Sequence, residues 1–243
     1  MDICIKPNER VEELYGGTRV IQNPDGFCYG TDAVMLSGFV SAKPNEKLLD
    51  FCTGTGVIPL CLRLLTRCRD MTALEIQPEV ADMAERSVRL NGFESEIKVV
   101  CGDLKNAKEL FGAESFDVVT CNPPYMKPLS GKENINDSKT IARHEVLCTL
   151  GDVIKSAASV LRTGGRFYMV HRPERLAEIF YLMKQEKLEP KRMQFVHSDF
   201  AAAPSLVLVE GQKGRKSGLV VLEPALAKGI DKIIEQAGVN FDD

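Results

Sequence analysis

The stretch CNPPYMKP at residues 121–128 places an Asn and a Tyr on either side of two prolines, directly after the apolar run FDVVT. The Asn122 side-chain carbonyl and the Pro123 main-chain carbonyl are acceptors for the two N–H groups of one amino group. Proline fixes φ and prevents helix and sheet pairing, so these carbonyls are held rigidly and point outward. Tyr125 adds a flat face for stacking. The pattern predicts a clamp for a planar NH2 group, and by itself it fits adenine as well as glutamine.

Such an amino group is a poor nucleophile because its lone pair is delocalised into the neighbouring π system. Two acceptors on its N–H groups favour a more tetrahedral nitrogen, with the lone pair aimed at an electrophilic methyl group. No general base is required before attack, since the proton leaves after the nitrogen has become cationic. Positioning alone contributes about 7–11 kcal/mol in well-oriented reactions. Asn-Pro and Pro-Pro are also typical of turns, but after a predicted strand we favour the chemical interpretation.

Glycines and acids follow the predicted strands where open α/β sheets bind ligands. Gly54 and Gly56 lie between the run KLLDF and the next helix, and glycine there lets a ligand approach the backbone. Asp50, Glu75 and Asp103 end the first three strands, so all three should lie on one side of the sheet. An acid in the place of Glu75 can accept two hydrogen bonds from a ribose diol. Together these residues favour a nucleoside-type cofactor.

An adenosine cofactor without phosphates fits this turn better than a dinucleotide. A dinucleotide-binding fingerprint has a third glycine, and Pro59 stands in that place. An acid-lined crevice also suits a cation. The predicted cofactor is therefore S-adenosylmethionine (SAM), whose sulfonium is positively charged.

Apolar runs alternate with helical patterns along the chain. Strands are predicted at 47–51, 71–76, 97–103, 116–122, 166–171, 191–197 and 204–214. Helices are predicted at 57–67, 78–92, 151–165, where Gly164 and Gly165 end the helix, and 173–187. The alternation indicates a parallel sheet covered on both faces, closed by an antiparallel hairpin of the last two strands. The predicted fold class is α/β, with a seven-stranded, mostly parallel sheet.

The 243 residues are expected to form one domain. Within it we expect an N-terminal segment (1–46) that contributes to the cofactor site, a cofactor-binding and catalytic core (47–218) and a C-terminal tail (219–243). No apolar run has the length of a membrane span, and the N-terminus lacks the parts of a signal peptide. We therefore expect a cytoplasmic protein that does not bind a membrane.

The eight cysteines include no CxxC pair, which argues against a zinc site, and the chain is no small secreted disulfide framework. We expect small buried hydrophobic thiols and no metal. The net charge is −3, yet residues 162–218 carry 11 Lys/Arg and 6 Asp/Glu, a net charge of +5. This basic third fits a contact with a phosphate backbone or, equally, a solvated face.

Four motifs, LLDFCTGTG, LEIQPE, CGDL and NPPY, occur in an order and spacing that resemble the class I SAM-dependent methyltransferases, which have a Rossmann-like fold. Five further stretches, VIQNPDGFCYGTDAVMLSGF, IARHE, VHRPERL, LEPKRMQFVHS and LVLVEGQKG, resemble the bacterial tRNA (adenine-N6) methyltransferases that act on valine tRNA. The resemblance covers about residues 14–218. It implies N6-methylation of an unpaired adenine in a tRNA partner, which we expect in the anticodon loop.

The resemblance also implies roles for individual residues. It assigns the target base and catalysis to Asn122, Pro123, Pro124 and Tyr125. It assigns the cofactor, with Glu75 on the ribose and Asp103 on the adenine amine, to Gly30, Thr31, Asp32, Asp50, Cys52, Thr53, Gly54, Gly56, Glu75, Ile76, Asp103, Leu104 and Asn122. Candidate contacts with RNA phosphates are Arg143, Arg172, Lys213, Arg215 and Lys216. The loop 127–143 is expected to be mobile without RNA and to order over the base.

Two departures from the family pattern bear on these expectations. Cys52 stands where the family usually has glycine, and the tail 219–243 does not resemble the family's usual end. The main alternatives are N5-methylation of a protein glutamine and another amino-methyltransferase of the NPPY type. The glutamine enzymes carry a helical domain that the 46 residues before KLLDF do not resemble. A non-catalytic SAM-binding or RNA-binding module is the third reading. The oligomeric state stays open, with a monomer slightly favoured.

Overall fold

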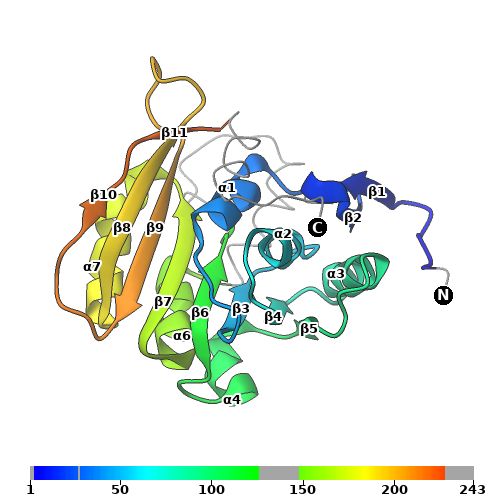
Figure 1. Cartoon of the computed structure of the whole chain (residues 1–243), viewed down its shortest axis with the longest axis horizontal. Coiled ribbons are helices and arrows are strands. Elements are labelled where there is room, and N and C mark those ends of the chain that lie inside the picture. The colour runs from blue at the N-terminus through cyan, green and yellow to red at the C-terminus, as the bar shows by residue number, and fades with distance from the viewer. Residues whose placement is uncertain (1–2, 27, 126–147, 228–243) are drawn as a thin grey trace, which may run out of the picture.

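A computed structural model describes residues 3–26, 28–125 and 148–227. Its described residues form a nine-stranded sheet with the order β10-β8-β9-β7-β6-β3-β4-β5, and β11 also pairs with β8 (Figure 1). The strands of this sheet are β3 (Lys47–Phe51), β4 (Asp70–Glu75), β5 (Ile97–Cys101), β6 (Phe116–Cys121), β7 (Leu161–His171), β8 (Leu188–His197), β9 (Leu206–Lys213), β10 (Val220–Val221) and β11 (Ala225–Leu226).

The five strands β5, β4, β3, β6 and β7 run parallel to one another. β9 runs antiparallel to both of its neighbours, β7 and β8. The predicted α/β fold, a mostly parallel sheet with a C-terminal antiparallel hairpin, is therefore confirmed. We call the side on which the parallel strands end the carboxyl end of the sheet, and the side on which they begin the amino end.

The sheet has two strands more than the seven expected. The additional strands are β10 and β11, two residues each, which pair in parallel with β8. Leu222 N–H also donates to the Met193 carbonyl (2.8 Å) and Ala227 N–H to the His197 carbonyl (2.8 Å). Strands of two residues have no readable period, so only the pairing reveals them. The first part of the tail is thus held along the outer side of β8.

The helix expected at 151–165 ends earlier than its glycines suggested. α6 (Leu150–Val160) stops at Val160, and Leu161 already pairs with Phe116 as the first residue of β7. Gly164 has φ +83°, and a Cβ on Gly165 would lie 2.9 Å from the Arg162 carbonyl. These glycines serve an irregular strand start, where the β6–β7 register shifts, rather than a helix end.

Local signals account for the starts of two helices. A capping box begins α6: the Thr149 hydroxyl accepts from Asp152 N–H (3.1 Å), and the Asp152 carboxylate accepts from Thr149 N–H (2.9 Å). Pro78 opens α3 (Pro78–Leu90), where its missing N–H costs no hydrogen bond. The start of each helix is thus encoded within a few residues of it.

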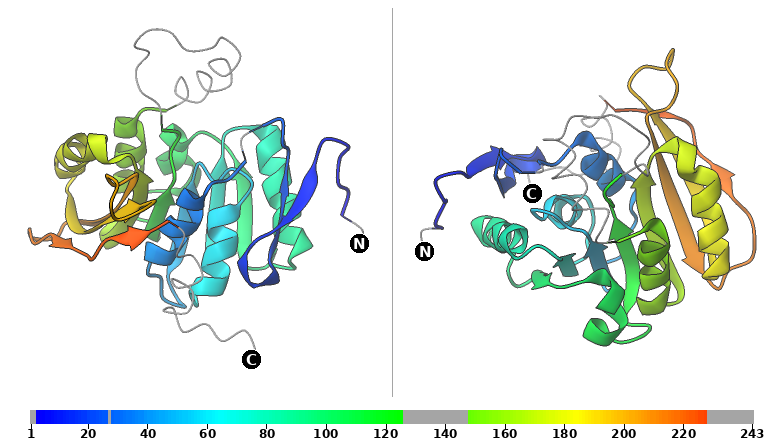
Figure 2. Two further views of the ribbon diagram at one scale, coloured as in Figure 1. Left: turned by 90° about the horizontal axis from the view of Figure 1, so that it is seen from above. Right: turned by 180° about the vertical axis from the view of Figure 1, so that it is seen from behind.

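Helices cover both faces of the sheet (Figures 1 and 2). α1 (Thr31–Phe39) and α2 (Val57–Leu65) pack on one face, together with α3. α4 (Ala107–Phe111), α6 and α7 (Leu176–Gln185) pack on the other face. In the described ranges, no helix combines the length and apolar character needed to cross a membrane.

A short hairpin, not expected from the sequence, precedes α1. Its strands are β1 (Arg10–Glu13) and β2 (Arg19–Gln22), and it lies against α3. Ile21 N–H donates to the Ser87 hydroxyl (2.9 Å), and Arg86 forms an ion pair with Glu9 (2.6 Å). These contacts bring the segment after β2 close to the carboxyl end of the sheet.

Candidate functional site

A pocket of about 500 Å³ opens at the carboxyl end of the sheet, a typical size for a small-molecule site. Most of the predicted site residues line it: Gly30, Asp32, Cys52, Gly54, Glu75, Ile76, Asp103, Leu104, Asn122, Pro123, Pro124, Tyr125 and Arg172. They come from α1, from the ends of β3, β4, β5 and β6, and from the end of β7. The parallel strands thus deliver the separate motifs to one place, as the order of elements predicted.

The glycine turn after β3 has the tight geometry that the motif predicts. Gly54 has φ +58° and Gly56 has φ +89°, and nothing lies within 4 Å of a Cβ built on Gly54. Cys52 also has a left-handed φ, +54°, at the place where glycine was expected. A cysteine in this region is strained. The turn therefore keeps the glycine-like backbone despite its side chain.

Glu75 is a buried carboxylate that faces this turn. One of its oxygens accepts from Gly54 N–H (3.0 Å), and the other accepts from Gln77 N–H (3.0 Å). The oxygen bound by Gln77 also accepts from the Gln77 side-chain amide (3.3 Å), whereas the oxygen bound by Gly54 keeps a second lone pair free for a ligand hydroxyl. No ion pair of the described residues includes Glu75, so its charge is not cancelled by a neighbouring cation.

An apolar slot with an acid at its end lies beyond Glu75. Ile76, Val80 and Leu104 supply apolar surface, and Asp103 is half-buried beside them. The Asp103 carboxylate accepts from Lys105 N–H (2.9 Å) and pairs with the Lys105 ammonium (3.4 Å). A flat ring fits such a slot, with the carboxylate placed to accept from an amino group on the ring edge.

The pocket is rich in negative charge. Asp32, Glu75, Glu79 and Asp103 line it, against one cationic side chain, that of Arg172. Asp50 lies behind the turn, fully buried, and does not line the pocket. Burial raises the Asp50 pKa from 3.8 to about 7, opposed by the Thr120 hydroxyl, which donates to the carboxylate (2.6 Å).

The NPPY segment leaves β6 and forms the opposite wall. The Tyr125 hydroxyl donates to the Asn122 side-chain carbonyl (2.5 Å), so this oxygen acts as a hydrogen-bond acceptor in the protein itself. Burial, followed by the nearby Asp32 carboxylate, raises the Tyr125 pKa, which keeps the phenol a neutral donor. A carbonyl oxygen has two lone pairs. An incoming N–H group can therefore share or replace the tyrosine contact.

Two residues at the end of β7 hold the Tyr125 ring. The His171 ring packs edge-on against it, with 5.2 Å between centroids, and the Arg172 guanidinium lies over it at 5.2 Å. His171 Nδ1 accepts from Arg172 N–H (2.8 Å). Burial, followed by the charge of Arg175, lowers the His171 pKa to about 4, so the ring is neutral at pH 7. Sequence reasoning treated Arg172 as a phosphate contact, and the structure places it on the tyrosine.

Three thiols meet beside the pocket. A hydrogen bond with Cys121 raises the pKa of Cys52, and a hydrogen bond with Cys52 raises the pKa of Cys148. All three are protonated at neutral pH and therefore weak nucleophiles. The expectation of buried thiols holds for Cys61, Cys68 and Cys121. It does not hold for the others, since Cys28, Cys52 and Cys148 line the pocket and Cys4 and Cys101 are exposed. Among the described residues, no three or more His, Cys, Asp or Glu side chains are grouped so that they could hold a metal ion.

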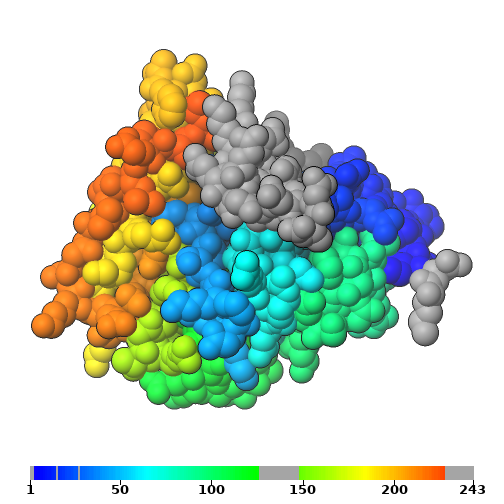
Figure 3. Space-filling view, in the orientation of Figure 1, coloured from blue at the N-terminus to red at the C-terminus, as the bar shows by residue number. Residues whose placement is uncertain are grey.

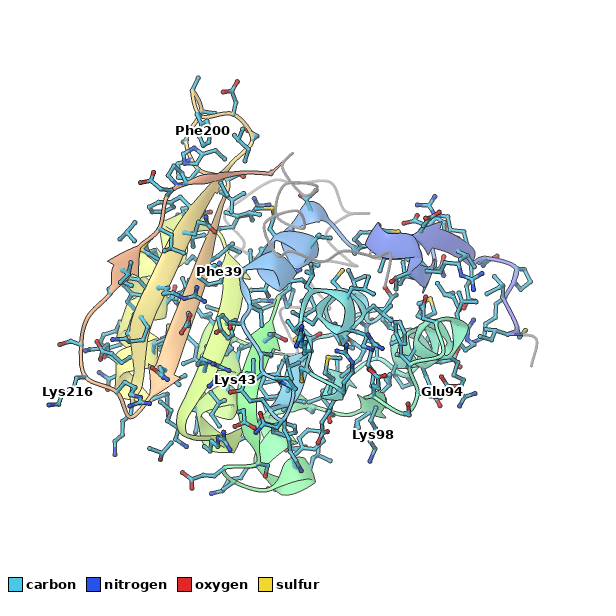
Figure 4. The ribbon with its side chains drawn as sticks, in the orientation of Figure 1. Phe39, Lys43, Glu94, Lys98, Phe200 and Lys216 are labelled. Carbon is cyan, nitrogen blue, oxygen red and sulfur yellow. The ribbon has the colours of Figure 1, made fainter. Side chains whose placement is uncertain are left out.

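Some predicted residues lie elsewhere. Thr31, Thr53 and Gly56 belong to the same segments but, like Asp50, do not line the pocket. Lys213, Arg215 and Lys216 lie at the amino end of the sheet, because β9 runs back antiparallel to β7; Figure 4 shows Lys216 and Phe200 at opposite ends of the β8–β9 pair. Arg143 and the loop 127–143 lie outside the described residues.

The sequence did not predict 10 of the 23 residues that line the pocket. The missed residues are Asn23, Gly26, Cys28, Leu74, Gln77, Glu79, Val80, Met83, Gly102 and Cys148. The residues of α3 could have been predicted, because the helix begins directly after Glu75 and its first turns must therefore lie at the carboxyl end of the sheet. No local signal distinguishes Cys28 or Cys148, which reach the pocket through tertiary packing.

Comparison with known proteins agrees with this geometry. A tRNA1(Val) (adenine(37)-N6)-methyltransferase of Porphyromonas gingivalis is 28% identical over 187 residues, covering 74% of this chain and 72% of the relative. A protein of the same name from Trichodesmium erythraeum is 27% identical, covering 68% and 71%.

Solved structures share the fold. A predicted O-methyltransferase of Agrobacterium tumefaciens has a TM-score of 0.65 at 19% identity, covering 84% of this chain and 96% of that one. Pyrococcus horikoshii TYW2, in complex with MeSAdo, has a TM-score of 0.59 at 15% identity, covering 85% and 72%. The family model of the methyltransferase small domain matches residues 25–188. The chain is thus a member of the methyltransferase small domain family.

Proposed function

We propose that this protein transfers the methyl group of SAM to N6 of an unpaired adenine in tRNA, at position 37 of the anticodon loop. The observation that carries the proposal is the Asn122 carbonyl, held as a hydrogen-bond acceptor by the rigid NPPY segment on the wall of an acid-lined pocket. The names of the relatives supply the choice of tRNA and of position 37. Such a substrate implies a cytoplasmic enzyme.

The pocket residues fit SAM. Glu75 has one oxygen with a free lone pair for the ribose diol, and on its other oxygen a ribose hydroxyl would replace the Gln77 side-chain amide. Asp103 stands at the end of the apolar slot for the adenine amine. The open space beside Gly54 leaves room for the ligand against the backbone. Asp32 and the N-terminus of α1 lie on the side toward Tyr125, where the methionine part would extend. When bound, SAM supplies an electrophilic methyl group on a cationic sulfur.

The protein's own groups position the amine. In the proposed reaction the Asn122 side-chain carbonyl accepts one N–H of the adenine amine, and the Pro123 main-chain carbonyl accepts the other. These two contacts favour a nitrogen whose lone pair points toward the methyl group. The nitrogen loses its proton after the new bond has formed, so no buried base is needed, and His171 stays neutral. Exclusion of water by the pocket strengthens the hydrogen bonds on the amine.

The Tyr125 ring is the proposed stacking face for the target base. Arg172 covers the ring at present and would share its face with the base or move aside toward phosphate. A base must leave its own stack to enter this pocket, which costs least in an unpaired loop. Lys213, Arg215 and Lys216 are proposed contacts for a more distant part of the tRNA. They lie roughly 25 Å from the pocket, judged from the eight residues of β9.

A substrate assay tests the proposal. The protein is incubated with methyl-labelled SAM and either fractionated tRNA or a purified release factor, and the products are digested and identified. We expect N6-methyladenosine at position 37 of valine tRNA and no label in protein. Label that appears only on a glutamine would contradict the proposal and would favour the protein-methylating alternative. Label in another nucleoside would also contradict it.

A further inference from the structure

The loop 198–205, which joins β8 to β9, lies at the carboxyl end of the sheet and projects beyond the body of the molecule (Figures 3 and 4). The loop is held at its base. Ser205 N–H donates to the Val196 carbonyl (2.8 Å), and His197 Nδ1 lies 2.9 Å from the Ala202 carbonyl. Within the loop, Asp199 accepts from Ala201 N–H (3.0 Å) and Ala202 N–H (3.0 Å). The loop therefore has a defined conformation.

Phe200 is displayed at the end of this loop. Its side chain is 58% exposed, and the His197 ring stands behind it at 5.9 Å with 54° between the planes. Among the described residues, the other large aromatic side chain with comparable exposure is Tyr181, on α7. A phenylalanine has no polar atom to offset its contact with water, and nothing in the described fold covers this one. A held loop that exposes such a ring is suited to stacking on a flat ligand.

Arg172 connects the loop with the NPPY wall. Its guanidinium donates to the Ser205 carbonyl (3.1 Å) and also lies over the Tyr125 ring. Tyr125 and Phe200 are thus two aromatic side chains at one end of the sheet, and Arg172 contacts both Tyr125 and the base of the loop that carries Phe200. Single-stranded nucleic acids are bound in this way, by aromatic faces for successive bases and cations for the phosphates between them.

We propose that Phe200, backed by His197, stacks on the base of the unpaired nucleotide next to the target adenosine, while Arg172 contacts the phosphate between the two. This inference rests on the proposed function and adds a second base-binding position to it. When the target base turns out of the anticodon loop, its neighbour loses a stacking partner. Phe200 supplies a replacement surface. Because any base has a flat face, this position would favour unpaired RNA without selecting its sequence.

The absence of tryptophan from the chain gives a direct test. Phe200→Trp introduces a single tryptophan on the loop, and Tyr181→Trp is a matched control on α7. The probe is an RNA hairpin with the anticodon loop of valine tRNA, whose binding is followed separately by anisotropy of an attached dye. We expect the hairpin to quench the fluorescence of the Phe200→Trp protein and to leave that of the Tyr181→Trp protein unchanged. A hairpin without bases on both sides of position 37 should bind more weakly and quench little.

Kinetics supply the second readout. Phe200→Ala and Phe200→Leu should each raise KM for the hairpin about tenfold and leave the Kd for SAM unchanged. Tyr181→Ala is the control, and we expect it to change neither quantity. Phe200→Leu keeps an apolar side chain on the loop, so equal losses in both variants show that the flat ring matters.

Hairpin binding without quenching, or an unchanged KM, overturns the inference. Quenching by a release-factor peptide but not by RNA assigns the surface to a protein instead. A hairpin that does not bind the wild-type protein contradicts the proposed function itself, and this inference with it.

Discussion

Buried acids at the two ends of the sheet have different partners. At the amino end, Glu46 pairs with Arg166 (2.5 Å) and Asp117 pairs with Arg162. At the carboxyl end, Glu75 is held by two backbone N–H groups and the Gln77 side-chain amide, and Asp50 is held by the Thr120 hydroxyl. In the described part of the chain, neither of these two acids takes part in an ion pair.

Of the two acids at the carboxyl end, Glu75 lines the pocket, whereas Asp50 lies behind the glycine turn and does not reach it. A carboxylate paired with arginine has its charge neutralised, and its role ends with the fold. A carboxylate held by neutral donors keeps its charge orientated but uncompensated. Of the four acids that line the pocket, Asp103 pairs with Lys105, and the other three form no ion pair among the described residues, so the pocket is able to attract a cation. The acids at the amino end thus have their charge compensated within the fold, and the acids at the carboxyl end mostly do not.

The largest expected effect is at the NPPY wall. Asn122→Ala should lower the rate of methyl transfer by about 10³-fold, because one acceptor that orientates the amine is lost, and it should leave the Kd for SAM within about threefold. Transfer is measured with the hairpin at saturating SAM, and SAM binding by calorimetry. Tyr125→Phe is the control: it keeps the ring but loses the hydroxyl that donates to Asn122, and we expect less than a tenfold loss. Abolished SAM binding in Asn122→Ala would show that the residue serves the cofactor rather than the base.

The second effect is on stability. Because the Asp50 pKa is raised to about 7 in the folded state, the folded protein binds more protons than the unfolded chain between about pH 4 and 7, and the wild type loses stability as pH rises through that window. Asp50→Asn removes this titration. The free energy of unfolding of the variant minus that of the wild type should therefore grow by up to about 4 kcal/mol from below pH 4 to above pH 7. Urea unfolding from pH 5 to 8 measures the difference. Asp117→Asn, at the amino end, should instead destabilise by about 1 kcal/mol because it weakens the pair with Arg162. If the free energy of unfolding of Asp50→Asn minus that of the wild type shrinks as pH rises, the raised pKa of Asp50 is contradicted.

The third effect distinguishes the two ends by ligand binding. Glu75→Ala should raise the Kd for SAM about 100-fold, since two hydrogen bonds to a charged acceptor are lost. Glu46→Gln is the matched control at the amino end and should leave the Kd unchanged. Calorimetric titration of both variants with SAM gives the comparison. Equal losses in the two variants would mean that the difference between the ends has no bearing on binding.

The smallest effect concerns the basic residues at the amino end. Replacing Arg215 and Lys216 together by alanine should raise KM for full-length tRNA about threefold and reduce its salt dependence, but leave the hairpin unaffected. The hairpin lacks the more distant part of the tRNA that is proposed to contact these side chains. The measurement is KM for both RNAs at two salt concentrations. A change with the hairpin would require an RNA path different from the one proposed, and no change with either RNA would make these residues merely solvated.

Much of the site was predictable because parallel strands repeat one local rule. Each strand of a βα unit ends on the same side, so Glu75, Asp103 and Asn122 could be assigned to one crevice from their positions after apolar runs. The left-handed turn was also predictable from Gly54 and Gly56. The end of α6 was not, because Gly164 and Gly165 fit a helix end as well as a strand irregularity until the pairing with β6 is known.

The sequence by itself determined the α/β class, the order of strands and helices along the chain, and the motifs at the strand ends. These depend on periodicity and on residues close in the chain. Only the tertiary structure decided which distant residues share a surface. In the tertiary structure Cys148 lines the pocket, Arg172 lies over Tyr125, and Lys213 lies at the amino end of the sheet. The physical reason is that an antiparallel return and side-chain packing depend on long-range pairing, which leaves no local pattern. The same return places the loop that carries Phe200 at the carboxyl end of the sheet, the end at which the pocket opens.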